Sequence, residues 1–157
     1  MSSDPDSTRP MVTAVLVELR RLSNEIDRLD QLASDRFGVN RTDLRALELL
    51  SAAGKLAPTA LAAALDFTTG GVTTVIDRLE RAGYARRQPD PQDRRKIIVE
   101  ATPLAAAREG EVFGDLLRAT EALIASYSDA DLAMIGDFLL RSRAVIAGIR
   151  RPDPSVN

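Results

Sequence analysis

The sequence predicts a mainly α-helical fold with one small β-hairpin and long helices at both ends. Three observations lead to this prediction. Apolar residues recur at helical spacing near both ends, two short helical segments are adjacent in the middle, and two β-rich segments flank a polar loop directly after them. With 157 residues, the chain is long enough to bury the core of a single domain without disulfides.

The first predicted helix runs from about Met11 to Phe37. Its apolar residues form a narrow seam that suits packing against another helix: Val15, Leu19, Leu22, Ile26 and Leu29. Residues 1–10 and 151–157 hold too few apolar side chains to offset the entropy of ordering, so we expect a disordered arm and a disordered tail. The single folded domain is therefore expected to span residues 11–150.

Two short helices joined by a tight turn are predicted in the middle of the chain. Before them, Gly38 ends the first helix and Asn40 caps a helix with Asp43 in its first turn. The first short helix runs from Pro58 to Leu65, with proline in the first turn. The second is expected over residues 69–82 because four apolar residues mark its buried side: Val72, Val75, Ile76 and Leu79.

A β-hairpin is expected directly after this helix pair. Its strands are residues 84–87 and 96–101, and the loop between them, residues 88–95, is polar and contains proline. Thr102 and Ser128 are caps that open two more helices, the first to about Ser126. Helix, turn, helix and hairpin over residues 40–102 make a winged helix-turn-helix, which binds DNA with its second short helix in the major groove.

Composition excludes several other classes of protein. Cysteine and histidine are absent, which removes thiol and Ser-His-Asp catalysis and the common zinc sites, so we expect no enzyme, no metal and no cofactor. No apolar run approaches the ~20 residues that span a bilayer, and the N-terminus lacks an apolar signal core. We therefore expect a cytoplasmic protein with no membrane partner.

Basic residues are concentrated in one segment of a chain whose net charge is -2. Between Arg78 and Lys96, seven basic residues stand against three acidic ones. On the second short helix, the side opposite the apolar stripe presents polar residues that can meet base edges or phosphates: Thr69, Gly70, Thr73, Thr74, Arg78 and Arg81. Asp77 lies on the same side, and we interpret it as a tether for Arg81 or for the arginines of the hairpin.

The run from Thr69 to Tyr84, the loop Pro89–Arg95 and the closing Thr102 resemble the MarR family of bacterial transcriptional regulators. The resemblance extends over about residues 11–149, and its sharpest part is Asp-x-Arg at Asp93 and Arg95. It implies that Arg95, next to Arg94, enters the minor groove at the wing tip while Asp93 holds the Arg95 guanidinium. The loop departs from the family pattern in carrying two prolines and few cations.

The resemblance also implies how the protein assembles and is regulated. Residues 11–37 and 103–150 would form a homodimer on a pseudo-palindromic operator, acting as a repressor that a small aromatic or anionic ligand releases. Four arginines are candidates to meet such a ligand: Arg20, Arg21, Arg41 and Arg45. The alternative is a winged-helix protein-interaction module without operator binding, which the acidic composition also allows.

Overall fold

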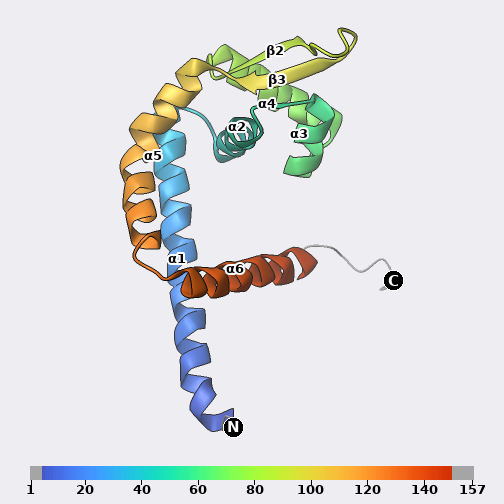
Figure 1. Cartoon of the computed structure of the whole chain (residues 1–157). Helices are drawn as coiled ribbons and strands as arrows, with labels where there is room; N and C mark the ends of the chain where they lie inside the picture. Colours follow the sequence, from blue (N-terminus) through green and yellow to red (C-terminus); the bar gives the residue numbers. More distant parts are fainter. Residues whose placement is uncertain (1–4, 150–157) are drawn as a thin grey trace, which may run out of the picture. The chain divides into compact units, whose positions relative to one another are not determined.

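Figure 1 shows the computed structural model of the chain, which describes residues 5–149. The elements follow in the order α1 (Pro5–Phe37), α2 (Arg41–Ala53), β1 (Lys55–Leu56), α3 (Pro58–Leu65), α4 (Thr69–Arg81), β2 (Ala85–Pro89), β3 (Ile97–Ala101), α5 (Pro103–Ile124) and α6 (Asp129–Ile149). Two compact units divide the chain, Met1–Val112 and Phe113–Asn157. The predicted fold class, mainly helical with a small β-hairpin, is confirmed.

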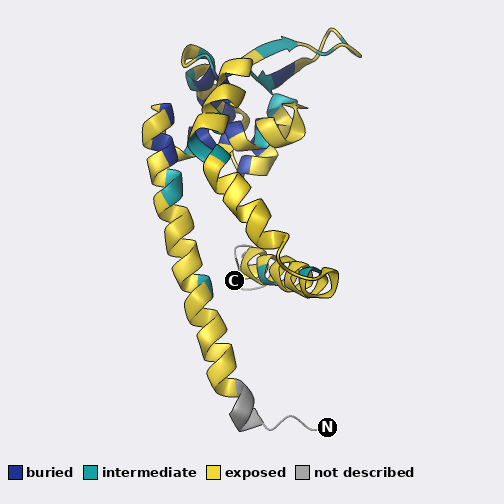
Figure 2. Cartoon of the chain, turned by 60° about the vertical axis from the view of Figure 1, so that its left-hand side comes forward, coloured by how far each residue is buried: buried dark blue, intermediate teal, exposed yellow. Residues whose placement is uncertain are grey.

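The core of the first unit lies where α2, α3 and α4 pack against one another and against the sheet. In Figure 2 the buried positions gather in this part of the unit, whereas most of α1 is exposed. The side chains that fill this core include Leu47, Leu50, Leu61, Val72, Val75, Ile76, Leu79 and Val99. The apolar stripe expected between residues 69 and 82 is thus the buried side of α4.

A tight turn joins α3 to α4. After Leu65, Asp66 takes the left-handed conformation with φ 58°. The N–H groups of Asp66 and Phe67 donate to the carbonyl oxygens of Ala63 and Ala62, at 3.3 and 2.9 Å. These bonds satisfy carbonyl groups at the end of α3 and redirect the chain, so that α3 and α4 are bent by 105°.

A three-stranded antiparallel sheet with the order β1-β3-β2 forms the wing. β2 and β3 pair from Ala85 opposite Ala101 to Pro89 opposite Ile97, which confirms the hairpin with boundaries shifted by one or two residues. The sequence did not predict β1, because two residues carry no periodic pattern. Pairing of Lys55–Leu56 with β3 anchors the inner edge of the hairpin.

Tyr84 joins the root of the wing to the end of α1. Its hydroxyl donates to the carbonyl oxygen of Phe37 at 3.1 Å, and the two rings meet edge to face with centroids 5.3 Å apart. Thr102, which closes the hairpin, donates from its N–H to Tyr84 at 2.9 Å and from its hydroxyl to Gly83 at 2.7 Å. The same hydroxyl accepts from the N–H of Ala105 and caps α5, as predicted.

α1 begins at Pro5 rather than Met11, so the prediction of a disordered arm is wrong for residues 5–10. Residues 1–4 and the predicted tail at 151–157 lie outside the described residues. The prediction relied on the low apolar content of residues 1–10. Adding residues to the N-terminal end of an existing helix requires no new helix nucleation, so it costs little free energy even without apolar contacts. Pro5 suits the first helical position, where its missing N–H would have no intrahelical partner.

In the second unit, a capping box opens α6, as predicted. The Ser128 hydroxyl accepts from the N–H of Asp131 at 3.2 Å and donates to its carboxylate at 2.6 Å. No described residue of α6 is buried, and several of its large apolar side chains are exposed: Met134, Phe138, Leu139, Leu140, Val145 and Ile146. Within residues 5–149 no single helix has the length and apolarity to cross a membrane, and α3 with α4 meets that criterion only as a bent pair.

Candidate nucleic-acid interface

α4 presents an exposed polar face opposite its buried stripe. The N-cap is Thr68, whose hydroxyl oxygen accepts from the N–H of Gly71 at 3.2 Å. Five of the residues expected to approach DNA follow along α4, and all five are exposed: Thr69, Gly70, Thr73, Thr74 and Arg81. A Cβ at Gly70 would meet nothing within 4 Å, so the first turn is open to close approach from outside. The structure therefore brings these five predicted residues together on one surface.

Arg78 does not belong to this exposed set. Its Nε and Nη2 donate to the two carboxylate oxygens of Asp43 on α2, at 2.8 and 2.5 Å. The hydrogen bonds with Asp43 raise the pKa of the Arg78 guanidinium above its ordinary value. The guanidinium of Arg78 is thus held in a two-pronged ion pair, and its expected contact with a base edge stays a prediction.

Burial of Asp43 makes this pairing necessary. The Asp43 side chain is 3% exposed and that of Arg78 is 35% exposed. Burying a carboxylate carries a desolvation penalty of several kcal/mol, which only the attraction and the hydrogen bonds of a partner such as Arg78 can offset. The N–H of Asp43 also donates to the Asn40 side chain at 2.9 Å, which confirms the predicted cap and places the carboxylate in the first turn of α2. Arg78 thus joins α4 to the start of α2.

Arg87 on β2 holds the wing against α4. Its guanidinium pairs with Asp77 at 2.7 Å and with Glu80, and its backbone N–H donates to Glu80 at 2.7 Å. A further bond reaches the carbonyl oxygen of Thr73 at 3.4 Å. The predicted tether role of Asp77 is confirmed toward this hairpin arginine, while Arg81 contacts only the Asp77 carbonyl oxygen, at 3.1 Å. Arg87 neutralises both acidic residues beside the exposed face.

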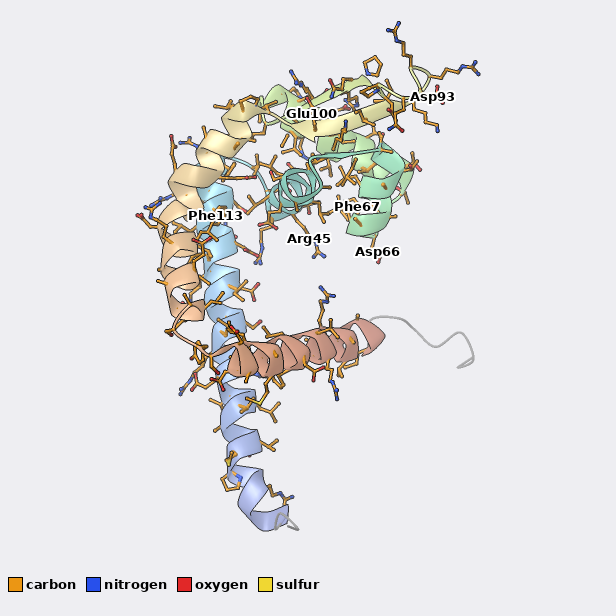
Figure 3. The ribbon with its side chains drawn as sticks, viewed as in Figure 1. Arg45, Asp66, Phe67, Asp93, Glu100 and Phe113 are labelled. Carbon is orange, nitrogen blue, oxygen red and sulfur yellow. The ribbon has the colours of Figure 1, made fainter. Side chains whose placement is uncertain are left out.

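The tip of the wing is held by backbone bonds to Asp93. In Figure 3, Asp93 lies at the far end of the hairpin, beyond Glu100. Its carboxylate accepts from the backbone N–H of Arg95 at 3.1 Å and pairs with Lys96 at 3.7 Å. The expectation that Asp93 holds the Arg95 guanidinium is therefore corrected. The carboxylate instead shapes the loop, and the side chains of Arg94 and Arg95 remain exposed.

Pairing decides which cations of the basic segment are free. Arg86 pairs with Glu100 on the neighbouring strand, so it adds little positive charge toward an outside partner. Within residues 78–96, all of which the structure describes, Arg94 and Arg95 are the two basic residues whose side chains make no ion pair or hydrogen bond with the chain. The positive charge without an ion-pair partner in this segment therefore lies at the wing tip and at Arg81 of α4, whose guanidinium bonds a neutral backbone carbonyl.

Sequence reasoning missed three residues that build this surface: Asp43, Thr68 and Arg87. Asp43 was recognised only for its place after a helix cap, and no local pattern points to a partner 35 residues away. Thr68 could have been found, because a threonine three residues before Gly71 is an ordinary N-cap signal. Arg87 belonged to the basic segment, but its contact with Glu80 depends on how the chain reverses between α4 and β2.

Comparison with known proteins agrees with this geometry. A family model described as the MarR family matches residues 37–96. The HTH-type transcriptional regulator YcgE of Bacillus subtilis is 33% identical over 122 residues, which cover 76% of this chain and 78% of that protein. The chain belongs to the MarR family of transcriptional regulators. Its relatives are regulators and not enzymes, in agreement with the predicted absence of catalytic function.

Solved structures of this family share the fold. A MepR variant from a multidrug-resistant S. aureus clinical isolate has a TM-score of 0.67 at 19% identity, over 84% of this chain and 96% of that chain. A second S. aureus MepR variant, solved bound to an oligodeoxyribonucleotide, has a TM-score of 0.57 at 18% identity, over 84% of this chain and 97% of that chain. At these identities the likeness shows the winged-helix fold.

Removing one partner of the Asp43–Arg78 pair is expected to destabilise the fold. Arg78→Met leaves a buried carboxylate unpaired and should lower the free energy of unfolding by about 3 kcal/mol, the lower end for buried pairs because Arg78 is partly exposed. Arg81→Met is the matched control and should change it by less than about 0.5 kcal/mol, as is usual for surface substitutions. Urea unfolding followed by circular dichroism, at one protein concentration, measures both. Equal losses for the two variants would contradict the structural role of Arg78.

Proposed function

We propose that the chain is a sequence-specific regulator that represses transcription by binding double-stranded DNA as a homodimer. The observation that carries this proposal is the pairing pattern: the first two turns of α4 offer an uncharged threonine face, and two free arginines of the basic segment lie at the wing tip. The exposed face of an α-helix fits the width of the major groove, and exposed guanidinium groups are attracted to the narrow, negative minor groove.

Dimerisation is supported by apolar surface that each unit leaves uncovered. Along α1, Val15, Leu22 and Ile26 of the predicted seam are 47, 55 and 50% exposed. In the second unit, α6 has no buried residue among those described. Many large apolar side chains exposed together on a helix are typical of a surface that associates with another protein chain. A two-fold dimer would place two α4 helices about one DNA turn, ~10 bp, apart on a pseudo-palindromic operator.

Release by a small aromatic or anionic ligand completes the proposal, and it rests on membership of the family. The absence of cysteine and histidine makes peroxide or transition-metal sensing unsuitable for this chain. Of the four candidate arginines, Arg21 pairs with Glu18 and Arg41 pairs with Asp27 and Asp30. Arg20 and Arg45, both exposed, are therefore the better candidates to meet an anionic ligand.

Arg95→Ala is expected to weaken binding to operator and to unrelated duplex alike, because the minor groove is read by charge and shape more than by sequence. The slope of log affinity against log salt should fall by about 1 for each arginine lost. Fluorescence-anisotropy titrations with both duplexes at two salt concentrations measure this. Arg118→Ala, which removes an equal charge from α5, is the control. Parental binding by Arg95→Ala would show that the wing does not touch DNA.

Leu22→Glu is expected to dissociate or unfold the protein, because it places an unpaired charge in a seam that dimerisation would bury, at a cost of several kcal/mol. Asn24→Glu adds the same charge to an exposed position of α1 outside the seam and serves as the control. Sedimentation velocity at micromolar concentration should give a dimer for the parent and the control. A monomeric parent would contradict the proposed assembly.

A panel of phenolic acids is expected to raise the melting temperature of the protein and to weaken its binding to the operator, since a ligand that binds the folded state stabilises it. Differential scanning fluorimetry and anisotropy competition measure the two effects. Arg20→Ala and Arg45→Ala should reduce the response if these residues meet the anion. A panel that leaves both the melting temperature and DNA binding unchanged would refute this class of effector.

The alternative function is a winged-helix protein-interaction module. A protein that binds no duplex at all in the titrations would favour that alternative.

A further inference from the structure

Two of the three threonines on the exposed face of α4, Thr73 and Thr74, have committed their hydroxyl protons to their own helix. The Thr73 hydroxyl donates to the carbonyl oxygen of Thr69 at 2.9 Å, and that of Thr74 donates to Gly70 at 3.3 Å. A hydroxyl has one proton to donate, so these side chains are left with acceptor lone pairs and a methyl group. Thr73 and Thr74 therefore offer an outside partner methyl groups and no hydrogen-bond donor.

The arginines near this face do not replace the missing donors. Arg78 lies one turn beyond Thr74, and its guanidinium is turned to Asp43, to which its Nε and Nη2 donate. Arg87 is held by Asp77 and Glu80. Arg81 stands 12 residues after Thr69, about 18 Å along the helix axis, and the first turns of a recognition helix are the ones that meet bases. It can reach a phosphate instead.

Guanine is recognised in the major groove through two acceptors, N7 and O6, and so requires donors from the protein. Thymine is the base that presents a methyl group there, and threonine methyl groups pack against it. We propose that α4 reads thymine methyl groups, through Thr73 and Thr74, and does not read guanine through Arg78. This specificity rests on the proposed DNA-binding function and names the kind of half-site that the function requires: one with thymine opposite the first two turns of α4.

The open first turn of α4 supports methyl readout. Methyl contacts need a closer approach of the helix backbone than long arginine side chains do, because threonine is short. Gly70 has no side chain, and a Cβ there would meet nothing in the protein within 4 Å, so a base edge can come close at this point.

The test begins with a duplex selected from a random library by the purified protein, titrated at one fixed salt concentration. Each thymine of its half-sites is then replaced by deoxyuridine, which removes the methyl group and keeps the base pairing. For each methyl that α4 contacts, affinity should fall about fourfold, the value that corresponds to burying one methyl-sized group. Replacing guanines by 7-deazaguanine should leave affinity unchanged at the positions that face α4.

Protein variants assign the effect to the two threonines. Thr73→Ser and Thr74→Ser keep the hydroxyl and remove the methyl, so each should lose about fourfold on the thymine duplex and become insensitive to deoxyuridine at its own position. Thr73→Val and Thr74→Val keep a methyl and remove the hydroxyl, so they should bind as the parent does. Thr13→Ser is the control, since Thr13 on α1 makes the same bond to the carbonyl four residues earlier, at 3.0 Å.

The outcomes separate this inference from the function beneath it. One outcome overturns the inference: a duplex is selected, deoxyuridine leaves its affinity unchanged, and 7-deazaguanine lowers its affinity. If Arg78→Met also abolishes the effect of 7-deazaguanine, Arg78 leaves Asp43 to read guanine. If no duplex is selected and binding shows no sequence preference, the proposed function itself fails and the inference falls with it. Melting temperatures of the threonine variants equal to that of the parent exclude misfolding as the cause of any loss, and Arg78→Met is titrated at a temperature where circular dichroism shows it folded.

Discussion

The ion pair between Asp43 and Arg78 is the contact on which the candidate interface depends. It joins two elements that are 35 residues apart in the sequence, and it is formed by the one acidic side chain in the core of the first unit, as far as residues 5–149 describe it. Because the carboxylate is buried, the guanidinium has to stay beside it. The pair therefore orients α4 on α2. It also holds the guanidinium of Arg78 against α2, so that this cation is not free on the surface of α4.

A second set of bonds positions the wing relative to the same helix. Arg87 connects β2 to the side of α4, and Tyr84 and Thr102 tie the root of the hairpin to the end of α1 and the start of α5. Each bond uses a group that would otherwise be an exposed charge or an unsatisfied polar atom. The two surfaces that we propose for DNA contact, the face of α4 and the wing tip, are thus held as parts of one unit.

These pairs also explain how an acidic protein can offer a DNA-binding surface. The net charge of -2 says little, because most cations of the basic segment are neutralised within the fold. What remains is a small amount of free charge at Arg81, Arg94 and Arg95 and an uncharged surface on the first two turns of α4. Such a surface derives less of its affinity from phosphates and more from shape and base contacts than a strongly basic one.

The sequence by itself determined the helices, the caps at Asn40, Thr102 and Ser128, the turn before α4, the hairpin and the family, because each is encoded by residues that are neighbours along the chain. It also placed Thr69, Thr73 and Thr74 on the outer face of α4, since helical periodicity is local. Only the tertiary structure decided that Arg78 is held and that Asp93 shapes the wing loop instead of binding the Arg95 guanidinium. The physical reason is that a charge is free or paired according to what packs beside it, and packing brings together residues whose separation in the sequence carries no signal.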